Sequence, residues 1–169
     1  MTMSDVPPTT PPPAMPGREQ TLVQWRAVFA GAFIGLVILV LLSVVSAVLD
    51  HFLDDFDDSG WIYPLFVGVL IGYAVGGFVA GRASPDGALT NGTLAGLGAF
   101  VLWIPVRILI WLVRDEDKGL FSGHSAVLRP GQIFGHLVIA SALGMLGGWL
   151  GARAVARRKN AGAAGRPTP

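Results

Sequence analysis

The stretch GVLIGYAVGGFVAGR, residues 68–82, carries the pattern that decides the fold. Small residues recur in it every four positions, at Gly68, Gly72, Gly76 and Ala80, within an otherwise apolar segment. In a helix this spacing places the small residues in one stripe along one face. Because such a stripe has no side-chain bulk, a second helix can approach it backbone to backbone. We therefore predict a membrane helix that packs through glycine and ends at the charged Arg82.

The composition of the whole chain agrees with a membrane protein. Of 169 residues, 52% are hydrophobic and only 14% are charged, which is too little polar surface for a soluble domain of this size. The chain has no cysteine, which excludes disulfides, thiolate metal sites and a cysteine nucleophile. The net charge is +1 and no basic stripe carries interleaved aromatic residues, so we expect no nucleic-acid partner.

Four apolar segments are each long enough to cross a bilayer, which takes about 20 residues. We predict spans at about 27–49, 61–81, 88–113 and 130–154. The first is too long for the apolar core of a signal peptide, typically about 7–15 residues, so we interpret it as an uncleaved helix. The prediction is an all-α, polytopic bundle of four transmembrane helices over residues 25–155.

Two polar tails flank this domain. Residues 1–24 begin with a proline-rich segment that cannot form a packed core, and we expect it to be disordered. It is either a solvated tail or a proline-rich ligand for a partner. Residues 156–169 are basic, and we expect a flexible tail.

Every predicted span contains small residues at four-residue spacing. We predict that the glycines of these stripes pack the helices together, either within the chain or against another membrane protein or a second copy. The predicted packing residues are Gly31, Gly35, Gly68, Gly72, Gly76, Gly92, Gly96, Gly144 and Gly148.

The second and fourth spans end alike. Residues 76–83 read GGFVAGRA and residues 147–154 read GGWLGARA. With a looser match between the starts of the first and third spans, this pattern suggests a helical hairpin used twice in parallel orientation. The alternative is a chance likeness between glycine-rich helices that end at arginine.

The distribution of Lys and Arg predicts the orientation. With four spans, both termini share one side, which carries eight Lys and Arg, whereas the other side carries three. Because positive residues favour the cytoplasmic side, we predict a multi-pass protein of a bacterial cytoplasmic membrane with both termini in the cytoplasm.

A polar layer is predicted in the outer half of the bundle. Arg107 lies inside an apolar span, which makes it a functional hypothesis by default, and Gln132 and His136 lie at a similar depth in the fourth span. Together they would bind an anion or a lipid headgroup. The alternative is that Arg107 snorkels to the outer interface and that His136 makes an interhelical hydrogen bond.

The outer loops carry an acidic cluster that would attract Ca²⁺ or Mg²⁺, but its spacing fits no EF-hand, and we predict no specific metal site and no cofactor. The acidic cluster consists of Asp50, Asp54, Asp55, Asp57, Asp58, Asp115, Glu116 and Asp117, with His51 and His124 nearby.

No sequence motif of a hydrolase, a zinc protease or a nucleotide-binding enzyme is present, so we expect no enzyme.

Three segments resemble a family of small four-helix bacterial membrane proteins, the YrzE-like group. They are GGFVAGRAS at the end of the second span, GALTNGTLAGLGAF at the start of the third and SALGMLGGWLGAR at the end of the fourth. The resemblance covers about residues 27–155 and implies a compact bundle in the cytoplasmic membrane, without an activity or site residues.

Two functions are consistent with these observations. The first is a non-enzymatic structural or accessory protein that packs through its glycine stripes, with the lipid bilayer and another membrane protein as partners. The second is a small transporter or channel subunit built around Arg107 and His136. The two differ in whether Arg107 and His136 face a shared hydrated cavity.

Overall fold

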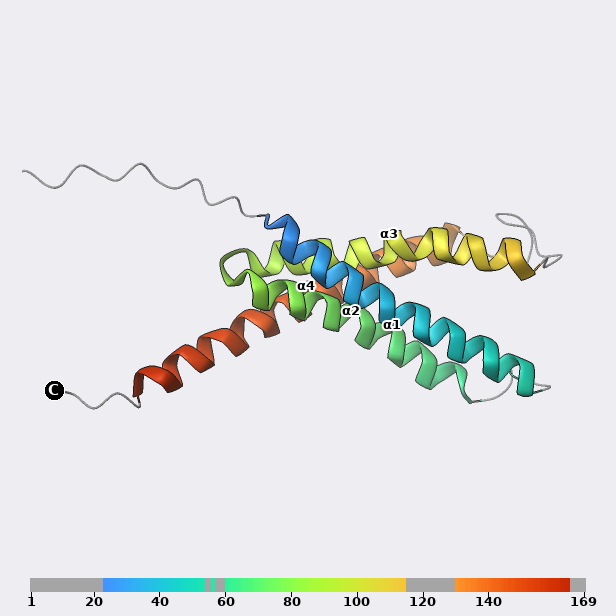
Figure 1. The fold of residues 1–169 in the computed structure, drawn as a ribbon, viewed down its shortest axis with the longest axis horizontal. Coiled ribbons are helices and arrows are strands. Elements are labelled where there is room, and N and C mark those ends of the chain that lie inside the picture. Colours follow the sequence, from blue (N-terminus) through green and yellow to red (C-terminus); the bar gives the residue numbers. More distant parts are fainter. Residues whose placement is uncertain (1–22, 54–55, 57–59, 115–129, 165–169) are drawn as a thin grey trace, which may run out of the picture.

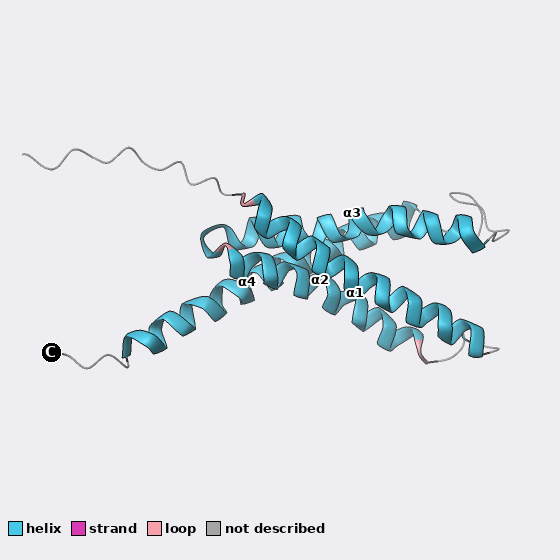
Figure 2. Ribbon diagram, in the orientation of Figure 1, coloured by secondary structure: helices cyan, strands magenta, loops and turns pink. Residues whose placement is uncertain are grey.

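The computed structural model describes residues 23–53, 56, 60–114 and 130–164. Within these ranges the chain forms four long helices and no strand (Figures 1 and 2), so the all-α prediction is confirmed. The helices are α1 (Trp25–Phe52), α2 (Ile62–Ala83), α3 (Ala88–Arg114) and α4 (Pro130–Ala164), and the short 3₁₀ turn η2 (Pro85–Gly87) joins α2 to α3.

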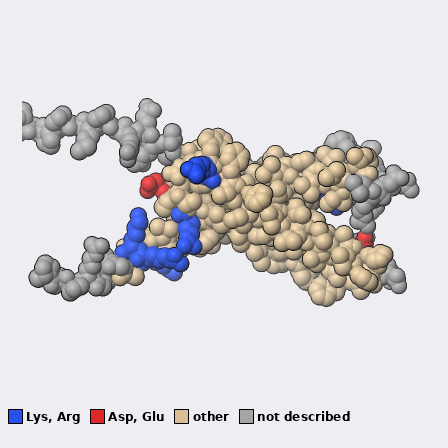
Figure 3. Space-filling model, viewed as in Figure 1, with Lys and Arg blue, Asp and Glu red and all other residues tan. Residues whose placement is uncertain are grey.

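All four helices are long and apolar enough to cross a membrane. Many of their large apolar residues are exposed; Phe33 and Phe134, for example, expose 62% and 68% of their surface. Figure 3 shows a body without charges between two ends where Lys, Arg, Asp or Glu appear. An apolar surface of this extent would be covered by lipid, and the chain is a membrane-spanning protein.

The helix bounds agree with the predicted spans at every end but one. We expected the fourth span to end near residue 154 and a flexible tail to follow, but α4 continues as a helix to Ala164. The tail prediction is therefore wrong for residues 156–164. Residues 153–164, RAVARRKNAGAA, are mostly good helix formers without proline, so nothing ends the helix where it leaves the apolar span. Most of the predicted proline-rich tail, residues 1–22, lies outside the described residues.

Each hairpin packs both within itself and against the other. Helix α1 contacts α2 and α3, α4 also contacts α2 and α3, and α2 touches α3. Hence α1 lies beside α3, and α2 beside α4, with each of these pairs running in the same direction (Figure 1). We call the end of the bundle at Trp25, Ala83 and Ala88 the inner end, and the opposite end the outer end.

The two ends differ in packing. Near the inner end, small residues are buried between the helices. Among them are Ala32, Ala80 and Ala95, which expose 1% or less of their surface. Towards the outer end, the α1–α2 pair diverges from the α3–α4 pair (Figure 1). The core lies in the inner and middle parts of the bundle, and the outer half is open.

Candidate functional site

The glycines predicted to pack helices lie at contacts inside the bundle. A Cβ atom added to Gly31 would meet the carbonyl oxygen of Gly76 on α2, and one added to Gly76 would lie 2.8 Å from the carbonyl oxygen of Gly31. Gly35, Gly68 and Gly72 also line the α1–α2 contact. Only glycine allows backbones to come this close.

The second hairpin is packed in the same way. Cβ atoms added to Gly92 and Gly144 would each lie 2.5 Å from the other residue's carbonyl oxygen, and Gly96 faces Ala140. Gly148 faces Ala88 and Gly92. All nine predicted packing glycines therefore lie against side chains or backbone of this same chain.

A third glycine contact joins α2 to α4. Gly77 and Gly81 lie against the backbone of Gly144 and Gly148, and Gly147 and Gly151 lie against α2 between Ala74 and Arg82. We did not predict Gly77 and Gly81, although the pairs Gly76-Gly77 and Gly147-Gly148 were visible signals: two adjacent glycines leave two faces of one helix free for neighbours.

The structure also shows how the two helix endings correspond. The gapless match between GGFVAGRA and GGWLGARA pairs Gly76 with Gly147, but Gly76 faces α1 whereas Gly147 faces α2. The residue that occupies the place of Gly76 in the second hairpin is Gly148, which faces α3. Because one residue turns a helix by about 100°, the residue pairing in the match is displaced by one position. An internal duplication stays a prediction.

A buried polar cluster at the inner end was not predicted. The Asn91 side chain donates to Ser84 Oγ at 2.7 Å and accepts from the Gln24 backbone N–H at 2.9 Å, and Ser84 Oγ donates to the carbonyl oxygen of Ala80. Ser84 and Asn91 are fully buried. Because the cluster links α1, α2 and α3, it closes the inner end; its only sequence signal was an asparagine inside a small-residue helix face.

The outer half contains an open cavity of about 900 Å³ that is lined by all four helices. Its floor contains Leu39, Tyr73 and Trp103, which belong to or pack against the buried core cluster. This volume is in the range of cavities that hold small molecules, about 300–1,000 Å³.

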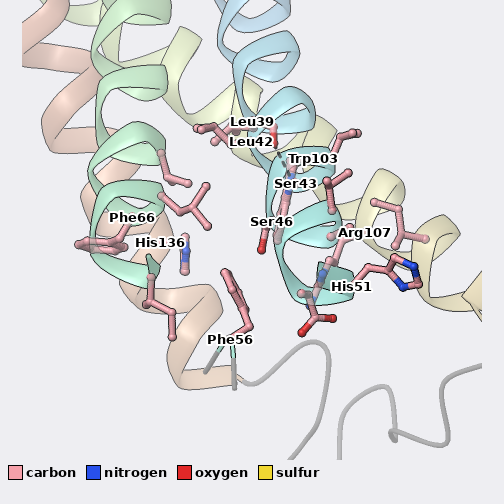
Figure 4. A pocket seen from close by; sticks show the side chains of 18 of the residues that line it. Leu39, Leu42, Ser43, Ser46, His51, Phe56, Phe66, Trp103, Arg107 and His136 are labelled. Atoms are coloured by element: carbon pink, nitrogen blue, oxygen red, sulfur yellow. Dashed lines mark hydrogen bonds between the residues drawn. The ribbon is translucent and has the colours of Figure 1, made fainter. Parts of the chain in front are cut away.

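The predicted polar residues meet in this cavity. Arg107 from α3 and Gln132 and His136 from α4 all line it. Arg107 lies seven residues before the end of α3 and His136 six residues after the start of α4, so both are about 10 Å along their helices from the outer end. Figure 4 shows His136 on one side of the space and Arg107 on the other, with Ser46 between them. Thus Arg107 and His136 face a shared cavity.

The His136 ring is held in one position. Its Nδ1 donates to the carbonyl oxygen of Gln132 at 2.8 Å, since a carbonyl can only accept. The ring stacks on Phe100 and Trp103, with centroid distances of 6.0 and 6.5 Å. With Nδ1 engaged, Nε2 is the nitrogen that remains for a ligand.

The walls of the cavity differ in polarity. From α2, the lining residues above Tyr73 are all apolar; they are Ile62, Leu65, Phe66 and Val69. From α1, the lining includes polar groups, which are Ser43, Ser46, Asp50 and His51. Trp103 Nε1 donates to Ser43 Oγ at 3.4 Å, and this hydroxyl donates to the carbonyl oxygen of Leu39. The cavity is therefore amphipathic, with one apolar wall.

The acidic cluster of the outer loops falls mostly on residues that the structure does not describe. Within the described ranges, no group of three His, Asp or Glu residues is placed to hold a metal ion. Asp50 and His51 line the outer mouth of the cavity. The absence of a specific metal site stays a prediction.

The inner end carries the basic residues of α2 and α4. Arg153 lies over the ring of Trp149, 5.0 Å from its centroid, and Figure 3 shows Lys and Arg side chains gathered at the end where α4 leaves the bundle. Paired with an interfacial tryptophan, these arginines are suited to a lipid headgroup layer.

Searches against protein-family models, curated proteins and solved structures find no match for this chain. The resemblance to the YrzE-like group therefore stays a prediction.

Proposed function

We propose that the chain is a small, membrane-embedded ligand-binding protein of the transporter or channel-subunit type. One observation carries this proposal: Arg107, Gln132 and His136, from two helices, converge on a cavity that all four helices line. A charged side chain at membrane depth is costly and therefore indicates a functional role. Because Arg107 lines the cavity, that role would be contact with a ligand.

The alternative, an accessory protein that binds partners through its glycine stripes, is less well supported. The stripes lie against helices of the same chain, so a partner or a second copy would have to bind through the large apolar residues on the outside. These residues are scattered over all four helices, as lipid contact requires.

We propose binding rather than catalysis. The Ser43 hydroxyl has nucleophile chemistry, but it donates to the backbone carbonyl of Leu39 and not to a base. A nucleophile needs a base within hydrogen-bond reach. Likewise, the packed inner half supports a binding site that is closed at the inner end better than an open pore.

The proposal includes the orientation predicted from Lys and Arg. With the inner end in the cytoplasm of a bacterial cell, the basic ends of α2 and α4 meet the anionic inner leaflet. The cavity then opens towards the outside of the cell, where it would receive its ligand.

Solvent access to the cavity tests the proposal. Because the chain lacks cysteine, Ser46→Cys places a single thiol in the cavity lining, and Val45→Cys places one at nearly the same depth on the outer surface of α1. In lipid nanodiscs we expect a charged, water-soluble thiol reagent to modify the Ser46→Cys protein and to leave the Val45→Cys protein almost untouched, because a thiol in lipid does not ionise. Equal, slow modification of both variants would show a dry outer half and reject the proposal.

A further inference from the structure

We propose that the ligand of the outer cavity is an amphipathic anion, a single carboxylate or phosphate headgroup attached to an apolar chain. This inference rests on the proposed function and names the class of its ligand. The charge in the lining, the polarity of the walls and the sides on which the cavity opens all favour such a ligand.

The headgroup position follows from the charged side chains. Arg107 is the cationic residue of the described lining, and its planar guanidinium binds carboxylate or phosphate through two parallel hydrogen bonds. On the other side, Nδ1 of His136 donates to Gln132, so Nε2 of the neutral ring is a hydrogen-bond acceptor. Arg107 would therefore hold the anionic group, and His136 Nε2 would accept from a headgroup hydroxyl or a bound water.

Asp50 does not reverse this preference. It lies at the outer mouth, two residues before the end of α1, and is exposed, whereas Arg107 lies about 10 Å from the outer end and is half-buried. Since a charge interaction strengthens as water is excluded, the deeper Arg107 dominates for a headgroup that enters the cavity. A cationic headgroup at that depth would meet Arg107 unfavourably.

The apolar chain has a surface of its own. The α2 wall, Ile62 to Val69, offers only apolar side chains to the cavity, and Phe66 is also 47% exposed at the surface of the bundle. On α1, Val44 and Val48 likewise both line the cavity and face outwards. The cavity therefore adjoins the hydrocarbon of the bilayer as well as the outer end, which suits a ligand that arrives from the outer half of the membrane.

A competition experiment with the Ser46→Cys protein tests this ligand class. In nanodiscs of zwitterionic lipid, oleate should slow the modification of the thiol at position 46, whereas oleyl alcohol, which has the same chain without the charge, and acetate, which has the charge without the chain, should not. Nanodiscs that contain phosphatidylglycerol test whether an anionic membrane phospholipid also slows the modification of the thiol at position 46. Protection by oleate alone identifies a free acid, and protection in phosphatidylglycerol identifies a lipid headgroup.

The role of Arg107 is tested by substitution in the same assay. Arg107→Gln should raise the half-protecting concentration by roughly 10- to 100-fold, because a charge-assisted hydrogen-bond pair is lost, and Arg107→Lys should fall between it and the parent. Arg153→Gln, which removes the same charge at the inner end, is the matched control and should change nothing.

Equal protection by oleyl alcohol, protection by acetate alone, or protection by oleylamine in place of oleate would overturn the inference. If the thiol of the Ser46→Cys protein is modified and no amphipathic anion protects it, the ligand class is wrong while the proposed function stands; if that thiol is never modified, both fail. The comparison between oleate and oleyl alcohol uses the protein with Arg107 intact. It therefore tests the ligand class even if the Arg107→Gln protein fails to insert into the membrane.

Discussion

At the scale of single residues, the glycines of this protein differ widely in what surrounds them. At Gly81 the three nearest atoms to an added Cβ are all backbone atoms of Gly148, whereas at Gly135 nothing lies within 4 Å. Backbone cannot move aside as the end of a long side chain can, so the same substitution has opposite consequences at the two sites.

We expect Gly81→Ala to destabilise the bundle and Gly135→Ala to leave it unchanged or slightly more stable. The first change forces α2 and α4 apart, and overpacking of this kind costs about 1–3 kcal/mol; the second improves helix propensity by up to about 1 kcal/mol. Thermal unfolding in detergent measures both. An unchanged melting temperature for Gly81→Ala would contradict the α2–α4 glycine contact.

At the scale of helices, contacts between parallel neighbours hold the two hairpins together. Chain order favours contacts between consecutive helices, because short connections make antiparallel neighbours. It does not determine that α1 packs on α3. In the structure, a Cβ added to Gly98 on α3 would lie 3.0 Å from the Cβ of Ala32 on α1, which places the two helices in direct contact.

The double variant Ala32→Cys/Gly98→Cys tests this contact. At 3.0 Å the two Cβ positions are closer than the separation of about 3.8 Å that a disulfide takes, so a small outward shift of α1 from α3 allows the bond. No native cysteine competes. We expect oxidation in membranes to join the two cysteines in a disulfide. Neither thiol should then react with a maleimide polymer that is added after denaturation. Phe33→Cys/Gly98→Cys, with Phe33 pointing outwards, is the control and should stay reactive; equal reactivity of both pairs would contradict the packing of α1 on α3.

At the scale of the whole molecule, one half of the bundle is closed and the other is open. The glycine contacts and the Asn91–Ser84 cluster close the inner end, and the cavity occupies the outer half. The side of the membrane on which the cavity opens therefore follows directly from the orientation of the chain.

Orientation is tested with one cysteine at each end. Gly60 and Ala161 are both exposed, Gly60 in the α1–α2 connection and Ala161 in the inner extension of α4. In intact bacterial cells we expect an impermeant thiol reagent to modify Gly60→Cys, and to modify Ala161→Cys only after the cells are permeabilised. The reason is that the predicted topology assigns eight Lys and Arg to the inner side and three to the outer side. The reverse pattern would invert the proposed topology.

Much of the architecture was predictable from local sequence. Apolar segments of span length predict membrane helices because unpaired backbone groups are excluded from lipid, and small residues at four-residue spacing predict close helix contacts whatever the partner. The three residues of the polar layer were also predictable, since charge and hydrogen-bonding groups stand out against apolar neighbours. The end of α4 was not, because beyond the membrane the pattern of apolar residues no longer marks a helix.

The sequence by itself thus determined the helices, their glycine faces and the depth of Arg107 and His136, since each depends on residues close together in the chain. Only the tertiary structure decided which glycine faces which helix, because the adjacent pairs Gly76-Gly77 and Gly147-Gly148 each serve two neighbours. It also decided that Arg107 lines a cavity. That outcome depends on how far the two hairpins diverge at the outer end, which is set by packing between segments distant in sequence.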